Sequence, residues 1–170
     1  MNKPIHNFFA NDHKRIDSIL EKAIENPEAI DMDLYKKFRI ELLTHIKMEE
    51  KILFLSAQRA NNNQPLPIAK QLRLEHGAIT ALMVPSPNKD LIKVLLHVLE
   101  KHDLKEEETG GMYDMCENLL IDQISTVLQE LASVTKVPVQ PHNDAPIALE
   151  SAKRALNRAG FDYDEIVNLK

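Results

Sequence analysis

The sequence is organised around residues 44–54, THIKMEEKILF, in which His45 precedes Glu49 by four positions. A segment of the same form, KHDLKEE, spans residues 101–107 and again places a histidine four positions before a glutamate. Residues four apart on an α-helix differ by about 40° around its axis and by about 6 Å along it. Each histidine therefore lies beside its glutamate on one helix face, which predicts two pairs of metal ligands on two helices.

Composition indicates one globular domain and argues against nucleic acid as a partner. The chain has 170 residues, of which 44% are hydrophobic and 28% charged, with a net charge of −5. A chain of this length can bury a sizeable core. Lysine and arginine do not cluster, tryptophan is absent and aromatic residues make up only 5%, so we expect no nucleic-acid partner.

The expected compartment follows from the apolar runs and from cysteine usage. The apolar runs are far shorter than the roughly 20 residues that cross a bilayer, and residues 1–6 form no apolar signal core. Cys116 is the only cysteine, which rules out an internal disulfide and fits a reducing compartment. We therefore expect a cytoplasmic protein with no membrane partner.

Only four glycines and little β-branched alternation predict an all-α fold. Apolar residues at helical spacing predict long helices over residues 3–24, 31–60 and 68–84, and from residue 88 onward. The glycine pair at 110–111 interrupts the last of them. Residues 112–134 therefore form either its kinked continuation or a separate helix.

The last part of the chain has a different composition. Residues 137–146 are rich in proline, which removes backbone donors and disfavours a helix just before it. A helical pattern follows and ends at Gly160. We predict a helical bundle over residues 1–136, and a proline-rich linker with extra C-terminal helical segments over residues 137–170. The apolar side of this tail is expected to dock on the bundle or to form a homodimer.

Four histidines fall on the predicted inner faces of the long helices, and two of them precede a glutamate by four positions. A hydrogen-bonded core residue explains any one of them, but four imidazoles and two carboxylates in an apolar core each need a partner. A pair of metal ions supplies partners to all six at once. The predicted metal ligands are His13, His45, Glu49, His76, His102 and Glu106, and no catalytic residue is predicted.

Other polar residues near these positions are expected to lie outside the site. Glu50 and Lys51 turn away from the inward face of their helix and are expected at the surface. His6 lies roughly 10 Å from His13 along the helix axis, too far to share a metal with it. His97 is expected to be exposed.

Ligand chemistry narrows the choice of metal. Imidazole and carboxylate without thiolate suit iron, manganese or zinc. Two histidines for each metal and two shared carboxylates leave coordination positions open for water or for a small diatomic ligand. Ferritin-like bundles place glutamate and histidine three apart and add further glutamates, so they are a poorer match.

Four motifs together resemble those of hemerythrin-like, or HHE cation-binding, domain proteins. They are D-H-x-x-I at residues 12–16, H-x-x-x-E-E-x-x-L-F at 45–54, E-H-x-x-I at 75–79 and H-D-x-K-E-E at 102–107. The resemblance implies an up-down-up-down four-helix bundle. It also implies a non-haem centre of two iron ions bridged by Glu49 and Glu106, with zinc or manganese as alternative metals.

The chain departs from the oxygen-carrying hemerythrins at two places. Those proteins have a fifth histidine ligand four positions from the third-helix histidine, whereas here Leu72 and Thr80 flank His76 at that distance. The chain is closer to the subgroup with four histidines and two glutamates, which resembles iron–sulfur repair proteins. Family members often have L-Y-P soon after the fourth motif, whereas Tyr113 here follows the glycine pair at 110–111.

Three functions are compatible with these residues. The first is a non-enzymatic di-iron protein that binds or senses oxygen or nitric oxide, or handles iron under oxidative or nitrosative stress. The second is a di-iron oxidoreductase, such as a peroxidase or nitric oxide reductase, for which Tyr35, Tyr113 and Glu107 are the only candidate proton donors. The third is an interaction module in which the metal, zinc for example, is structural and the tail recruits a partner.

Overall fold

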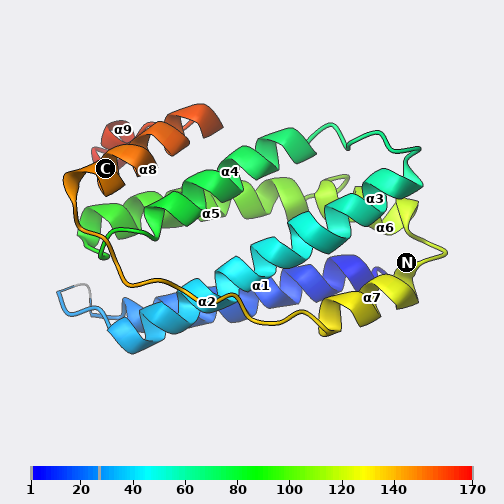
Figure 1. The fold of residues 1–170 in the computed structure, drawn as a ribbon, viewed down its shortest axis with the longest axis horizontal. Coiled ribbons are helices and arrows are strands. Elements are labelled where there is room, and N and C mark those ends of the chain that lie inside the picture. Colours follow the sequence, from blue (N-terminus) through cyan, green and yellow to red (C-terminus); the bar gives the residue numbers. More distant parts are fainter. Residues whose placement is uncertain (1, 27, 170) are drawn as a thin grey trace.

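The computed structural model describes residues 2–26 and 28–169, and every regular element within these ranges is a helix (Figure 1). The predicted all-α fold is therefore confirmed for the described residues. The elements are α1 (Pro4–Ala23), α2 (Met32–Met48), η1 (Glu49–Leu53), α3 (Phe54–Ala60), α4 (Ala69–Leu82), α5 (Lys89–Glu107), α6 (Met112–Leu119), α7 (Ile124–Ala132), α8 (Pro146–Ala159) and α9 (Tyr163–Val167). None of these helices, which cover the described residues, has the length and hydropathy needed to cross a membrane.

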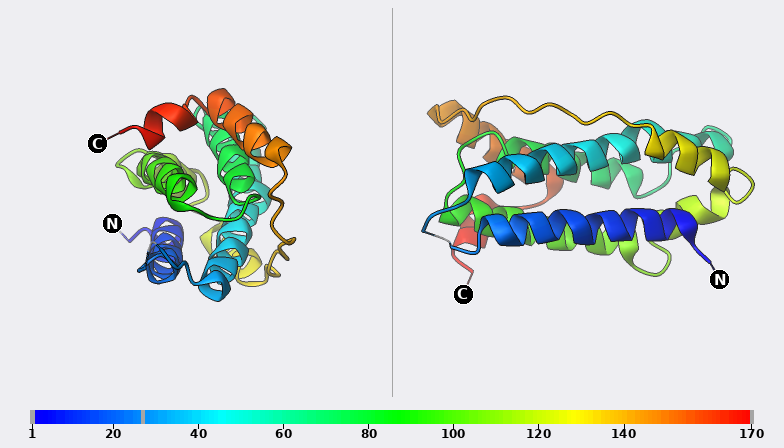
Figure 2. Two further views of the ribbon diagram at one scale, coloured as in Figure 1. Left: turned by 90° about the vertical axis from the view of Figure 1, so that its left-hand side faces the viewer. Right: turned by 90° about the horizontal axis from the view of Figure 1, so that it is seen from below.

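Four long helical segments lie side by side along the long axis of the molecule (Figure 1 and Figure 2). The first is α1, the second is the continuous helix formed by α2, η1 and α3, the third is α4 and the fourth is α5. In Figure 1 the chain runs leftward in α1 and α4 and rightward in the other two. Helix α1 packs against α2, α4 packs against α5, and α6 packs against both α1 and α5. The four segments thus surround a common interior.

Sequence signals at the helix ends agree with the structure. Pro4 is the first residue of α1, where a missing N–H leaves no hydrogen bond unmade. The Asp31 side chain caps α2 by accepting from two backbone N–H groups of the first turn, and Asn88 caps α5 by accepting from one. Gly160 ends α8 in the left-handed conformation, with φ of +89°. The end of α8 at Gly160 is confirmed as predicted.

The helix predicted over residues 31–60 is continuous but is not α-helical throughout. The segment Glu49–Leu53 is the π-helical turn η1, in which the N–H of Phe54 donates to the carbonyl oxygen of Glu49. Single π-turns inside α-helices are rare and occur frequently at functional sites. This turn begins at one of the predicted metal ligands.

The glycine pair at 110–111 separates α6 from α5, so the structure has a separate helix and not a kinked continuation. Gly110 has a φ of +81°, in the left-handed region that favours glycine. A Cβ at Gly111 would lie only 2.6 Å from the carbonyl oxygen of Lys105. The chain folds back onto the end of α5 because Gly111 has no side chain. A second break, at residues 120–123, separates α6 from α7.

The apolar core has two parts, one on each side of the predicted metal ligands. On α1, Phe9 belongs to one part and Ile16 to the other, with His13 between them. On α4, Leu72 and Ile79 are divided in the same way. The polar side chains therefore form a layer between two apolar layers. Such surroundings lower the local dielectric constant and strengthen every electrostatic interaction within the polar layer.

The segment after α7 is extended and runs along α2 before it reaches α8 (Figure 2). Arg39 donates to the carbonyl oxygen of Gln140 at 3.0 Å, and Asp144 accepts from the N–H of Ser86 at 2.7 Å. Helix α8 packs on α4, and Leu156 is fully buried in the apolar cluster that α4 also lines. The apolar side of the tail thus docks on the bundle. The domain division after residue 136 and the homodimer stay predictions.

Candidate metal centre

The structure brings all six predicted ligands together in the interior between the four long segments. His13 lies on α1, His45 on α2, Glu49 at the start of η1, His76 on α4, and His102 and Glu106 on α5. All six side chains are buried. They form two groups that share Glu49 and Glu106, one completed by His13 and His45 and the other by His76 and His102. Within each group, one donor atom from every residue lies within 4.8 Å of the others.

The two carboxylates have the orientation of bridges, because each offers one oxygen to each group. The distances from carboxylate oxygen to imidazole Nε2 are 3.3 Å for Glu49 Oε1 and His45, 3.1 Å for Glu49 Oε2 and His76, 3.5 Å for Glu106 Oε2 and His13, and 3.4 Å for Glu106 Oε1 and His102. All four imidazoles therefore present the same ring nitrogen, Nε2, to the interior.

A ring of four further carboxylates sets the orientation of these imidazoles. Each carboxylate belongs to the residue next to a predicted ligand and contacts the histidine of the following long segment. The ring therefore passes from α1 to α2, from η1 to α4, from α4 to α5 and from α5 back to α1. The distances to Nδ1 are 2.9 Å for Asp12 and His45, 2.9 Å for Glu50 and His76, 2.9 Å for Glu75 and His102, and 2.7 Å for Glu107 and His13.

This ring has a chemical consequence for the inner nitrogens. A carboxylate only accepts hydrogen bonds, so the proton of each neutral imidazole lies on Nδ1. The lone pair on Nε2 then faces the interior, as in histidines that bind metal ions. Sequence analysis missed these four roles. The available signal was an acidic residue directly beside a ligand in all four motifs.

Glu50 and His97 do not lie where the sequence predicted. Glu50 was expected at the surface, but it is half-buried and bonds His76 of the neighbouring helix. A residue one position from a ligand is about 100° around the helix, which directs it sideways to the next helix and not outward. His97 was expected to be exposed but is half-buried, with its ring edge-on to Phe161 of the tail.

Three of the atoms that could bind a metal are buried and have no hydrogen-bond partner among the described residues. They are Oε2 of Glu49, Nε2 of His76 and Oε1 of Glu106. Leaving a buried polar group unpaired costs roughly 1–3 kcal/mol, and more for a charged group. A metal cation can accept lone pairs from oxygen and nitrogen alike, so it would be a partner for all three atoms. The residues present therefore fit a pair of metal ions, and the donor set suits iron, manganese or zinc.

The two glutamates have opposite pKa shifts. Burial opposes the ionisation of Glu49, but the nearby imidazoles of His45 and His76 outweigh burial and hold its pKa well below the usual value. Burial and the negative charge of Glu49 raise the pKa of Glu106 well above the usual value. This shift favours the protonated form of Glu106 when no cation is bound, and a metal ion would displace that proton.

Tyr113 of α6 also lies in the site, although sequence analysis named it only as a candidate proton donor. Its hydroxyl donates to Oε1 of Glu49, with an oxygen–oxygen distance of 2.6 Å, and lies 2.9 Å from Oε2 of Glu106. The turn at the glycine pair brings it there. Tyr35, the other tyrosine named as a proton donor, instead stacks on His142 of the extended segment.

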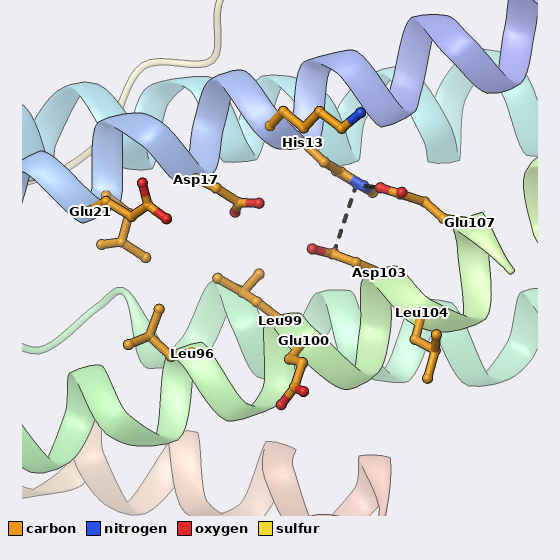
Figure 3. Close-up of a pocket in the computed structure, with 11 residues that line it drawn as sticks. His13, Asp17, Glu21, Leu96, Leu99, Glu100, Asp103, Leu104 and Glu107 are labelled. Carbon is orange, nitrogen blue, oxygen red and sulfur yellow. Dashed lines mark hydrogen bonds and ion pairs between the residues drawn. The ribbon is translucent and has the colours of Figure 1, made fainter.

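A cleft of about 460 Å³ between α1 and α5 reaches the site at His13 (Figure 3). In Figure 3, Asp103 and Glu107 point toward the His13 ring, while Asp17 and Leu99 face the gap from opposite helices. Burial raises the pKa of Asp103 to about 6. The cleft gives the His13 side of the site a route to solvent.

Comparison of the chain with known protein families, curated proteins and solved structures finds no match. The class of protein therefore rests on the structure alone. It is an all-helical protein with two buried clusters of histidine and glutamate that can hold metal ions.

Proposed function

We propose that this chain is a hemerythrin-like protein, with an up-down-up-down four-helix bundle that holds two metal ions. One ion binds His13 and His45, the other binds His76 and His102, and Glu49 and Glu106 bridge them. The orientation of the two carboxylates supports this proposal most directly, because each presents one oxygen to each pair of histidines. A second support is that three atoms of this cluster, on Glu49, His76 and Glu106, are buried without a hydrogen-bond partner among the described residues.

Iron is the metal we propose, with manganese and zinc as alternatives. The ligands are nitrogen and oxygen donors, and the single cysteine, Cys116, is not among the grouped residues. Such a set does not favour the soft metals that thiolates select. Elemental analysis of protein purified from its natural host decides between the metals.

The role we propose is binding or sensing of oxygen or nitric oxide, or iron handling under oxidative or nitrosative stress. Bound iron would supply coordination positions for a diatomic ligand. The surrounding chain keeps the site within two apolar layers and fixes every imidazole through a carboxylate on Nδ1. Outer partners that orient the ligands, and apolar layers that limit solvent access, are typical of sites that hold a metal firmly.

Anaerobic reconstitution with iron(II) tests this role. The absorption spectrum is recorded before and after oxygen or nitric oxide is added, and again after the gas is removed. We expect a new visible band that depends on the gas. A spectrum that responds to neither gas in protein that holds its iron would contradict the role without contradicting the metal centre.

A di-iron oxidoreductase is the second candidate, and the cleft beside His13 favours it. The cleft of about 460 Å³ would give a substrate a route to the His13 side of the site, as turnover requires. Asp103 and Glu107 line it, with carboxylate oxygens 3.9 Å and 2.7 Å from the ring nitrogens of His13, and are the carboxyl groups through which protons would enter the site. Steady peroxide turnover that falls in Asp103→Asn while iron content is unchanged would support this candidate.

A further inference from the structure

We propose that Tyr113 is a fifth protein donor to the metal ion held by His13 and His45, and that the two metal positions are therefore unequal. This inference rests on the proposed dinuclear centre and specifies its coordination. The Tyr113 hydroxyl oxygen lies close to one donor atom of every residue in that group. The distances are 2.6 Å to Glu49 Oε1, 2.9 Å to Glu106 Oε2, 3.1 Å to His13 Nε2 and 3.4 Å to His45 Nε2.

These distances are those of neighbouring ligands around one ion. Metal bonds to imidazole and carboxylate are about 2.1 Å long, so adjacent ligands at right angles lie about 3 Å apart. A phenol oxygen that only donated a hydrogen bond would need to approach one acceptor. Tyr113 instead lies near four carboxylate and imidazole atoms. Its single proton serves one of them at a time, and its oxygen accepts from another only where that atom carries a proton. A cation shared by all five atoms accounts for the cluster.

The position of Tyr113 is fixed by packing and by bonds between α6 and α1. Its ring stacks on Phe9, with centroids 5.1 Å apart, and has no exposed surface. Four residues on, Glu117 accepts from the backbone N–H groups of Ile5 and His6 at 2.8 Å and 3.0 Å. The hydroxyl is therefore held in place before any metal binds, which is the arrangement that ligands to metal ions need.

The second group has no equivalent of Tyr113 among the described residues. Oε2 of Glu49, Nε2 of His76 and Oε1 of Glu106 have no hydrogen-bond partner there. The metal at His76 and His102 therefore has four protein donors, against five at His13 and His45. Binding of Tyr113 would exchange its O–H bond for an oxygen–metal bond, and the proton would pass to solvent. An exogenous ligand would then have its open position beside His76 and His102.

Iron-loaded protein, oxidised to iron(III), tests this inference through its optical and resonance Raman spectra. Tyr113→Phe keeps the ring and its stacking and removes only the donor oxygen. Tyr35→Phe is the matched control, because Tyr35 is also fully buried but lies outside the two ligand groups. We expect a visible phenolate-to-iron(III) band with enhanced tyrosinate ring modes in the wild type and in Tyr35→Phe. Tyr113→Phe should lose both signals and bind one of its two ions about 10-fold or more weakly.

The possible results separate this inference from the proposed function. Wild-type protein that holds two iron(III) ions and shows no tyrosinate signal would overturn the role of Tyr113 and leave the dinuclear centre standing. Persistence of the signal in Tyr113→Phe would also overturn it. Wild-type protein that binds no iron would overturn both. If Tyr113→Phe does not fold, the wild-type spectrum and that of Tyr35→Phe still decide the question.

Discussion

Glu50 shows how a single side chain can orient a candidate metal ligand without belonging to either ligand group. Its bond to Nδ1 of His76 leaves the Nε2 lone pair directed at the ligand cluster. The same arrangement occurs at His13, His45 and His102. Four carboxylates outside the two ligand groups thus determine which nitrogen of every imidazole is available to a metal.

Replacing Glu50 with glutamine should weaken metal binding about 10–100-fold, because it removes the charge that holds the His76 ring. Titration with a competing chelator measures the affinity. Glu25→Gln is the matched control, since Glu25 is exposed beyond the end of α1. Equal affinities in the two variants would show that the carboxylate ring is unimportant for binding.

Protons should compete with metal at this site. The pKa of Glu106 is raised well above its usual value by burial and by Glu49, which favours a bound proton on this carboxyl until a cation arrives. Metal binding should therefore release protons, and the apparent affinity should fall as the pH falls. An indicator dye in weakly buffered solution measures the release. Affinity that does not change between pH 8 and pH 6 would contradict the assignment of Glu106 as a ligand.

At the scale of secondary structure, the turn between α5 and α6 decides whether Tyr113 reaches the site. Gly111 lies against the carbonyl oxygens of Lys105, Glu106 and Glu108, where a Cβ would be 2.6 Å, 2.9 Å and 2.9 Å away. Gly77, in contrast, is an exposed glycine in α4 whose added Cβ would meet nothing within 4 Å. A side chain is therefore excluded by close contacts at Gly111 but would fit freely at Gly77.

Alanine at these two glycines should change stability in opposite directions. Gly111→Ala should destabilise the fold by about 1–3 kcal/mol, because the overpacked turn must shift α6. Gly77→Ala should stabilise it by about 0.5–1 kcal/mol through helix propensity. Urea denaturation followed by circular dichroism gives both values. The account of the turn is wrong if Gly111→Ala is as stable as Gly77→Ala.

The sequence could predict the helices and the grouping of the candidate ligands, because both depend on residues that recur at helical spacing. Apolar residues at helical spacing located the long helices, and histidine four positions before glutamate located the two motifs. The π-turn at Glu49–Leu53 left no such trace, because its five residues are ordinary helix formers and tertiary packing sets the pitch. The contacts of Glu50 with His76 and of Tyr113 with Glu49 depend on how neighbouring helices are placed. Periodicity within one helix carries no information about that placement.

The whole molecule is organised as two apolar layers on either side of a polar layer, with the tail contributing to one of them. Leu156 of α8 is fully buried in the cluster that includes Ile79 of α4 and Val98 of α5. The extended segment that leads to α8 is bonded to α2 through Arg39. The tail should therefore unfold together with the helices that hold the site.

Leu156→Ala should cost about 2–5 kcal/mol of stability, the usual range for a buried leucine. Unfolding of the wild type, followed by circular dichroism, should remain a single transition. Ile147→Ala is the control, since Ile147 on the same helix is 60% exposed and should have little effect. Two separate transitions, with only the weaker one sensitive to Leu156→Ala, would show instead that the tail folds as its own unit.

We propose that Glu49 and Glu106 bridge two metal ions. The most direct test is the ratio of metal to protein in reconstituted wild type and in Glu49→Ala, measured by elemental mass spectrometry on chains of known concentration. Since Glu49 contributes to both groups, the account predicts two ions per chain in the wild type and loss of both in the variant. A wild type that binds at most one ion, or a Glu49→Ala variant that keeps two, would contradict it.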